Sequence, residues 1–394
     1  MNSMLNPLEF TLFLNRLPKV GMSAYWALVK QFGAIENALS QPVATLKPLF
    51  NDEAFSLLTQ CLSSPASSPL YNHVLKDLDW CEQHHIHVVH EASAQYPPLL
   101  RETKRAPNVL YVRGDVDVLT LPQIAMVGSR NPSPMGRQAA EDFARHLSTN
   151  GFVVTSGLAL GVDTYAHQGV VEAQGKTIAV MGCGIDQTYP RRNAKLADSI
   201  LAYGGAIVSE FPVGTSPQSQ NFPQRNRVIS GLSYGTLVVE AAIKSGSLIT
   251  ARFALQQNRE VFAIPGSIHS PLSRGCHSLI KSGATLVETG QDIVDELHGF
   301  LQREHELMQP SLDLFPDKPV DQPLNKPTAT LSTTTSTTHE TDHPILAHIG
   351  FDVTEVDIIA DRTALPISEL LVELMNLELA GFIDNCGAGY MRVK

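Results

Sequence analysis

The segment IAMVGSR at residues 124–130 decides the fold, together with FVVTSGLALGVD at residues 152–163. Residues 124–127 form a short apolar run that stops at turn residues, which predicts a buried strand, and residues 152–155 predict a second strand. Apolar residues recur every four positions between them, at Ala139, Phe143 and Leu147, and predict one face of a helix that starts near Arg137 and ends at Gly151. The order of strand, helix and strand predicts a parallel βαβ unit.

Each predicted strand ends in a turn of small residues, Gly128-Ser129-Arg130 and Ser156-Gly157. Ligands of open parallel sheets bind at the carboxyl ends of the strands, and backbone N–H groups at helix starts attract anions. With Arg130 beside them, the turns predict a phosphate site; ordinary strand-to-helix connections are the alternative. Neither turn matches G-x-G-x-x-G or G-x-x-x-x-G-K-[ST], so no nucleotide cofactor is expected.

The alternation continues through five more apolar runs separated by helix-length segments, near 177–181, 206–209, 236–239, 260–264 and 285–287. This pattern predicts an α/β fold in which helices cover both faces of a parallel sheet. We expect the sheet domain to span residues 71–298.

The N-terminal residues 1–70 read as helical, with a tight break at Leu17–Gly21 between two apolar-periodic stretches. Such a hairpin resembles SAM-like and helix-hairpin-helix modules, whose turn can bind a phosphate. A small helical domain without that role is the alternative, because only Lys19 supplies positive charge near the turn.

The C-terminal part begins with a linker, predicted at residues 299–343, in which ten of the fourteen residues from 328 to 341 are Ser or Thr. Residues 344–394 follow with helix caps at Thr354 and Ser368 and a hairpin around Gly387–Gly389, which resembles a winged helix. The second helix carries three Glu and no Lys or Arg, which favours a protein-interaction or regulatory role over DNA reading.

Composition limits the class of protein. The 394 residues are 43% hydrophobic, and the five cysteines lack C-x-x-C spacing, which indicates no disulfide framework and a reducing, cytoplasmic setting. We expect neither export nor a membrane span, because no run of about 18 apolar residues occurs. The net charge of −10 is uneven: 19 acidic and 6 basic residues follow residue 284, against 20 and 23 before it. Nucleic acid is therefore not excluded as a partner.

Cys81 and four histidines between residues 84 and 90 are residue types that bind metal ions, so a metal site is one interpretation of this segment. The segment Ile86–Val89 alternates like a strand, however, while Cys81 lies at the end of a predicted helix, so we expect these side chains to diverge. No metal is expected.

The segment FPQRNR at residues 222–227 offers an aromatic ring and two guanidinium groups. Single-stranded nucleic acid is held by aromatic stacking together with cations that follow the phosphates. The alternative is a helix start with Phe222 in the core and both arginines solvated. A third Gly/Ser helix start with a lysine follows at Lys244–Thr250. The resulting row of predicted anion sites fits a polymer better than a mononucleotide.

These motifs together resemble the DNA-processing protein A family (DprA, also called Smf) over roughly residues 122–297. The family binds single-stranded DNA during natural transformation and loads the recombinase RecA. The matching segments are GSR at 128–130, SGLALGVD at 156–163 with Ala166-His167, Tyr189-Pro190 with Asn193, Ser209-Glu210, FPQRNR at 222–227, Glu240-Ala241, SGSLIT at 245–250 and Pro265-Gly266.

The resemblance implies an extended Rossmann-like parallel sheet domain that forms a homodimer and binds single-stranded DNA without catalytic activity, with RecA and single-strand-binding protein as protein partners. Arg130 would pair with a phosphate and Phe222 would stack on a base. The DNA-binding residues implied are Gly128, Ser129, Arg130, Ser156, Gly157, Phe222, Arg225, Asn226, Arg227, Lys244, Gly246 and Ser247.

An enzyme is the competing class. The chain also resembles nucleotide-processing phosphoribohydrolases of the lysine decarboxylase-like fold, which use a P-G-G-x-G-T-x-x-E loop. Residues 231–240 keep Gly-Thr and a carboxylate, but they lack Pro-Gly-Gly and contain an extra residue. For Asp163 and Glu240 we expect a helix cap and a scaffold role rather than catalysis.

Overall fold

The computed structural model describes residues 5–297 and, further along the chain, residues 344–349, 354, 356–363, 370, 373–374, 377, 382–385 and 390–392. The chain divides into two compact units, residues 1–312 and 313–394, and each is described by itself. The predicted linker at 299–343 lies outside the described residues.

A nine-stranded sheet forms the centre of the first unit, in the order β1-β2-β6-β5-β4-β3-β7-β8-β9. In this order, all strands from β6 to β9 are parallel to their neighbours, which confirms the predicted α/β fold. At the other edge, β2 is antiparallel to β6 and β1 is antiparallel to β2. The strands are β1 (Ile86–His90), β2 (Val109–Gly114), β3 (Gln123–Val127), β4 (Val153–Ser156), β5 (Thr177–Met181), β6 (Ala206–Ser209), β7 (Gly235–Val238), β8 (Glu260–Ala263) and β9 (Thr285–Leu286).

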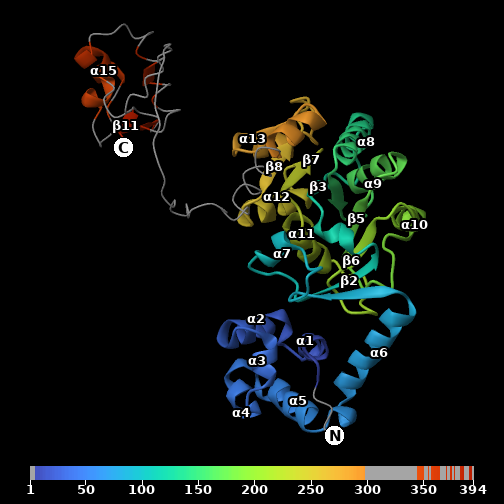
Figure 1. Ribbon diagram of the computed structural model, residues 1–394. Coiled ribbons are helices and arrows are strands. Elements are labelled where there is room, and N and C mark those ends of the chain that lie inside the picture. Colours follow the sequence, from blue (N-terminus) through green and yellow to red (C-terminus); the bar gives the residue numbers. More distant parts are fainter. Residues whose placement is uncertain are drawn as a thin grey trace, which may run out of the picture. The chain divides into compact units, whose positions relative to one another are not determined.

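Helices cover both faces of this sheet (Figure 1). Ile124 and Met126 of β3 pack in the core under α8 and α9, whereas Ala125 and Val127 pack in the core under α11 and α12. This alternation follows from the two-residue period of a strand. The helices are α7 (Pro98–Arg101), α8 (Pro134–Thr149), α9 (Val162–Glu172), α10 (Ala194–Ala202), α11 (Asn221–Gly231), α12 (Ser247–Gln256) and α13 (Arg274–Lys281), with 3-10 turns η3 (Asp117–Thr120) and η4 (Arg191–Asn193).

Helix α8 shows how local sequence sets these boundaries. The hydroxyl of Ser133 caps the helix by accepting a 3.0 Å hydrogen bond from the N–H of Gly136, and Pro134 occupies the first turn. The helix therefore begins three residues before the predicted start. It ends before Gly151, whose φ of +86° is the predicted left-handed residue.

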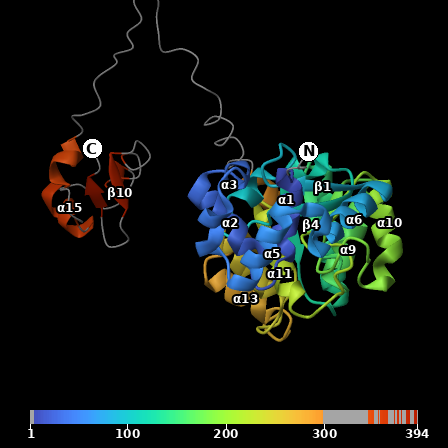
Figure 2. The ribbon, with the colours of Figure 1, turned by 90° about the horizontal axis from the view of Figure 1, so that it is seen from below.

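The N-terminal residues are helical, as predicted, and share one core cluster with residues of β5 and β6. Figure 2 shows these helices from below. The predicted break at 17–21 separates α1 from α2. The Trp26 indole donates to the Ala106 carbonyl at 2.9 Å, which ties α2 to the chain before β2. The elements are α1 (Pro7–Arg16), α2 (Gly21–Phe32), α3 (Ile35–Leu39), α4 (Val43–Leu46), η1 (Lys47–Leu49), α5 (Asp52–Ser63), η2 (Pro65–Ser67) and α6 (Pro69–Gln83). A separate domain at 1–70 stays a prediction.

The second unit has a small apolar core that includes Ile359, Leu370, Leu374 and Ile383. The predicted hairpin is confirmed, since β10 pairs with β11 in antiparallel fashion. Thr354, expected as a cap, exchanges two 2.9 Å backbone hydrogen bonds with Tyr390. Ser368 and Gly387–Gly389 lie outside the described residues. The elements are η5 (Pro344–His348), α15 (Val356–Thr363), β10 (Ile383–Asn385) and β11 (Tyr390–Arg392).

Candidate nucleic-acid interface

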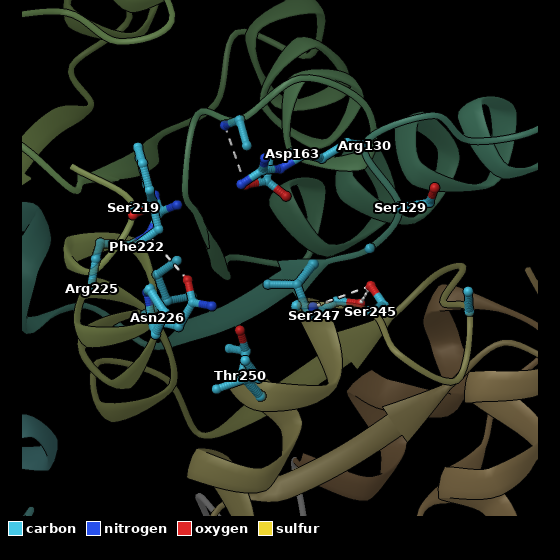
Figure 3. A pocket seen from close by; sticks show the side chains of 18 of the residues that line it. Ser129, Arg130, Asp163, Ser219, Phe222, Arg225, Asn226, Ser245, Ser247 and Thr250 are labelled. Atoms are coloured by element: carbon cyan, nitrogen blue, oxygen red, sulfur yellow. Dashed lines mark hydrogen bonds between the residues drawn. The ribbon is translucent and has the colours of Figure 1, made fainter. Parts of the chain in front are cut away.

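A pocket of about 720 Å³ lies at the carboxyl ends of β3 and β7 (Figure 3). These strands are neighbours, yet the chain runs from β3 to β4 on the other side, so the pocket occupies the point where the strand order reverses. Such a point is where open parallel sheets bind ligands. The walls come from residues 128–130 after β3, residues 245–250 after β7, and the first half of α11.

Arg130 and Phe222 lie beside each other in the lining. Arg130 is exposed, and its guanidinium carbon lies 6.0 Å from the centre of the Phe222 ring. The Tyr189 ring is 5.6 Å from the same ring, centre to centre. Phe222 rests against the backbone of Gly182, where a Cβ would come within 2.8 Å of the ring. An aromatic ring is thus held beside a cation and a second aromatic ring.

Arg225 and Asp163 are the other charged residues of the lining, and both are buried. The Arg225 guanidinium donates to the carbonyls of Gly157 and Val180. Asp163 accepts hydrogen bonds from the N–H groups of Gly157 at 3.1 Å and Ala159 at 3.3 Å. Burial raises the pKa of Asp163 and lowers that of Arg225, and the opposite charge of each residue counteracts the shift of the other.

The structure corrects the placement of Arg227 and Ser156. Arg227 is only 6% exposed, forms an ion pair with Glu210 and donates to the carbonyl of Arg105, so it does not line the pocket. Ser156 is fully buried and donates to the Met126 carbonyl at 2.6 Å. The alternative of solvated arginines at 225 and 227 is also wrong, because both side chains are buried.

The helix starts offer fewer bare N–H groups than predicted. The N–H of Ser247 points to the Ser245 hydroxyl at 3.3 Å, and that of Leu248 donates to the Ser245 carbonyl at 3.2 Å. The N–H of Gly157 is taken by Asp163. Besides Arg130, the pocket wall contains the hydroxyl-bearing residues Ser129, Ser219, Ser245, Ser247 and Thr250.

Seven further predicted residues can be placed. Lys244 is exposed on the loop that carries the pocket wall, but it is not part of the lining. Gly157 lines a smaller adjacent pocket of about 100 Å³, which shares Arg130 and Phe222 with the larger one. The structure brings together in the larger pocket Gly128, Ser129, Asn226, Gly246 and Ser247, with Arg130, Phe222 and Arg225.

Both candidate catalytic carboxylates are bonded to the scaffold. Glu240 accepts hydrogen bonds from the N–H of Ser133 at 2.9 Å and from its hydroxyl at 2.6 Å. Asp163 is not a helix cap, because Gly161 occupies the N-cap position of α9 and the Asp163 side chain bonds to the preceding turn instead. These contacts stabilise the connections after β3 and β4.

Tyr189 and Thr250 line the pocket, although the sequence did not single them out as binding residues. The Tyr-Pro pair at 189–190 was a usable signal for Tyr189, because a partly exposed aromatic beside proline marks a fixed loop. Thr250 carries no such signal: only the direction of α12 places it in the wall.

Within residues 5–297 and the described residues beyond them, no three His, Cys, Asp or Glu side chains lie close enough to hold a metal ion. Cys81 is buried, while the His84 ring stacks on Trp80 with centres 4.1 Å apart. In the same described parts, no helix is both long and apolar enough to span a membrane.

The fold and the pocket define a Rossmann-like protein with an arginine- and aromatic-lined pocket at the switch point of its sheet. Residues 87–298 match the family model described as DNA recombination-mediator protein A, and residues 327–389 match the DprA winged helix domain. The chain belongs to the DprA/Smf family.

Its relatives confirm this assignment. Protein Smf of Escherichia coli is 43% identical over 317 residues, which cover 80% of each chain. DNA processing protein DprA of Streptococcus pneumoniae is 46% identical over 201 residues, 51% of this chain and 71% of that protein. The X-ray structure of DprA from Streptococcus pneumoniae aligns with a TM-score of 0.60 and 34% identity, covering 74% of this chain and 98% of that one.

Proposed function

We propose that this protein binds single-stranded DNA through the pocket at β3 and β7. The observation that carries the proposal is the exposed Arg130 beside the ring of Phe222, in a pocket whose charged residues sum to one positive charge. A guanidinium group can pair with a phosphate, and an aromatic ring can stack on an unpaired base. Duplex DNA keeps its bases stacked on each other, so the same pocket favours single strands.

Replacement of Arg130 tests the phosphate contact. We expect Arg130→Ala to weaken binding of a labelled single-stranded oligonucleotide roughly tenfold or more, since hydrogen bonds to charged groups contribute about 1.5–3 kcal/mol. The slope of log affinity against log salt should become shallower by about 0.7, the loss of one phosphate contact on a single strand. Arg252→Ala removes an exposed arginine outside the pocket and should leave the slope unchanged. Equal slopes in all three proteins would count against the contact.

Replacement of Phe222 tests the stacking contact. We expect Phe222→Ala to weaken binding by about 1–3 kcal/mol, because base stacking on an aromatic side chain contributes that much, with the salt slope unchanged. Tyr203→Ala removes an aromatic ring that is 42% exposed away from the pocket and serves as the control. Binding of duplex DNA as tight as that of single strands, with neither variant altering it, would refute the proposal.

We propose further that the protein acts in the cytoplasm as a homodimer and loads RecA onto single strands coated with single-strand-binding protein during natural transformation. Membership of the DprA/Smf family supports this role. The test is RecA filament assembly on coated DNA with and without the purified protein. Unchanged assembly would reject the loading step.

We infer that the sheet domain acts without catalysis. Glu240, the counterpart of the carboxylate in the phosphoribohydrolase loop, has both oxygens bonded to Ser133, and Asp163 is bonded to backbone N–H groups. In this arrangement both carboxylates act as hydrogen-bond acceptors for the scaffold. Release of free base from a nucleoside monophosphate by the purified protein would overturn this inference.

A further inference from the structure

The turn from Gly157 to Gly161, which connects β4 to α9, has an unusual backbone. Leu158 has a φ of +55° and Gly161 has a φ of +88°. Leucine is disfavoured in the left-handed region, so surrounding contacts must hold the turn in place. Asn193 provides one of them, because its side-chain N–H donates to the Leu158 carbonyl at 2.8 Å.

Asp163 and Arg225 both bond to the same turn. The carboxylate accepts from two of its N–H groups, and the guanidinium donates to the carbonyl of Gly157. The guanidinium packs directly on this glycine, where a Cβ would lie 2.2 Å from one of its nitrogens. The two side chains thus bond to both the donor and the acceptor groups of one turn.

Two of the three side-chain nitrogens of Arg225, Nε and Nη1, donate to groups of the protein. Its N–H groups also donate to the carbonyl of Val180 and to the side-chain oxygen of Asn226, and the residue is only 4% exposed. His167, one helical turn after Asp163, is fully buried, and burial lowers its pKa to about 3. It therefore stays neutral and adds no charge to the pair.

The turn supports both residues assigned to DNA. Gly161 packs against the backbone of the Ser129–Arg130 segment, and the N–H of Val162 donates to the Ser129 carbonyl at 3.0 Å. On the other side, the Arg225 guanidinium carbon lies 5.9 Å from the centre of the Phe222 ring. A shift of the turn would therefore change the separation of Arg130 and Phe222.

We propose that Arg225 and Asp163 are positioning residues: they bind the Gly157–Gly161 turn rather than DNA, and they hold Arg130 and Phe222 at the separation that binds a single strand. This inference rests on the proposed function. It assigns Arg225 a role different from that of Arg130, although both are arginines of the same pocket.

Asp163→Asn separates this role from a direct one. If Arg225 paired with a phosphate, removal of the nearby carboxylate would strengthen single-stranded DNA binding. A positioning role predicts the opposite: affinity for an oligothymidylate falls roughly tenfold, with the salt slope of the unaltered protein retained. The variant is nearly isosteric, and far-ultraviolet circular dichroism checks its folding. Tighter binding, or a changed slope, would overturn the proposal.

Arg225→Gln and the double variant Asp163→Asn/Arg225→Gln complete a thermodynamic cycle. Each single change leaves one buried charge without the opposite charge that counteracts the effect of its burial, so we expect the double variant to recover stability and part of the DNA affinity lost in Arg225→Gln. The salt slope should stay unchanged in both. A slope shallower by about 0.7 in the double variant would identify Arg225 as a phosphate ligand instead.

A measurement without DNA distinguishes this inference from the proposed function. In the variant Phe222→Trp, the new indole would lie beside the guanidinium groups of Arg130 and Arg225. Asp163→Asn in this variant should shift the fluorescence emission of the new indole, measured after subtraction of the signal of Trp26 and Trp80. If the unaltered protein failed to bind single strands, the emission shift and the stability cycle would still report the coupling. An unchanged emission spectrum together with additive stability changes would overturn the coupling itself.

Discussion

Glu210→Ala should lower the free energy of unfolding by about 3–5 kcal/mol, because it leaves Arg227 as a buried cation without its counter-charge. The side chains of Glu210 and Arg227 are 4% and 8% exposed. Without Glu210, the Arg227 guanidinium would keep its hydrogen bond to the carbonyl of Arg105. For a domain of this size the change corresponds to a fall of roughly 10 °C in melting temperature. Thermal and urea unfolding of the purified protein provide the measurement.

Asp142→Ala is the matched control for this prediction. Asp142 also forms an ion pair with an arginine, Arg145, but the side chains of Asp142 and Arg145 are 52% and 42% exposed. Exposed pairs contribute about 0.2–1 kcal/mol, so the control should barely change the unfolding transition. The double variant Glu210→Ala/Arg227→Met should be more stable than Glu210→Ala alone, since it removes the unpaired charge as well. Equal losses for Glu210→Ala and Asp142→Ala would contradict the role assigned to burial.

The sequence predicted the sheet well because its strands are continuous apolar runs bounded by turn residues. Residues 177–181 and 206–209 are strands with the predicted boundaries, and β3 differs by one residue. The antiparallel edge strands β1 and β2 were harder to assign, since their pairing depends on contacts that local pattern does not encode. The positions of Gly128–Arg130 and Phe222 at one end of the sheet followed from the parallel order of the strands.

The roles of the arginines could not be predicted in the same way. Arg130, Arg225 and Arg227 look alike in the sequence, yet the first is exposed, the second is bonded to a turn and the third is paired with Glu210. Asp163, whose charge counteracts the burial of Arg225, is 62 positions away in the chain, and charge composition does not reveal which cations already have an opposite charge nearby. The number of free N–H groups at the helix starts was overestimated for a related reason: nearby serine side chains and carbonyls accept hydrogen bonds from N–H groups that have no evident partner in the sequence.

Gly161→Ala should lower the free energy of unfolding by about 3–5 kcal/mol and weaken single-stranded DNA binding by more than tenfold. The φ of +88° and ψ of −133° at this position disfavour any residue with a side chain. A Cβ there would also lie 2.3 Å from the carbonyl oxygen of Ser129 and 2.5 Å from the carbonyl of Arg130. Backbone atoms cannot rotate away as a side chain can, so the Arg130 segment itself must move.

Two other glycines separate the contributions to this effect. Gly151 has a φ of +86° with open space around its Cβ position, so Gly151→Ala should show the conformational cost alone, about 1 kcal/mol, and leave DNA binding unchanged. Gly246 lines the same pocket with a φ of −63° and open space, so Gly246→Ala should alter stability little. Urea unfolding and the oligonucleotide salt series of all three variants give the comparison. If Gly161→Ala resembled Gly151→Ala in both measurements, the contact between the β4–α9 turn and the Arg130 segment would not matter for the pocket, and Arg130 would have to be positioned by its own loop.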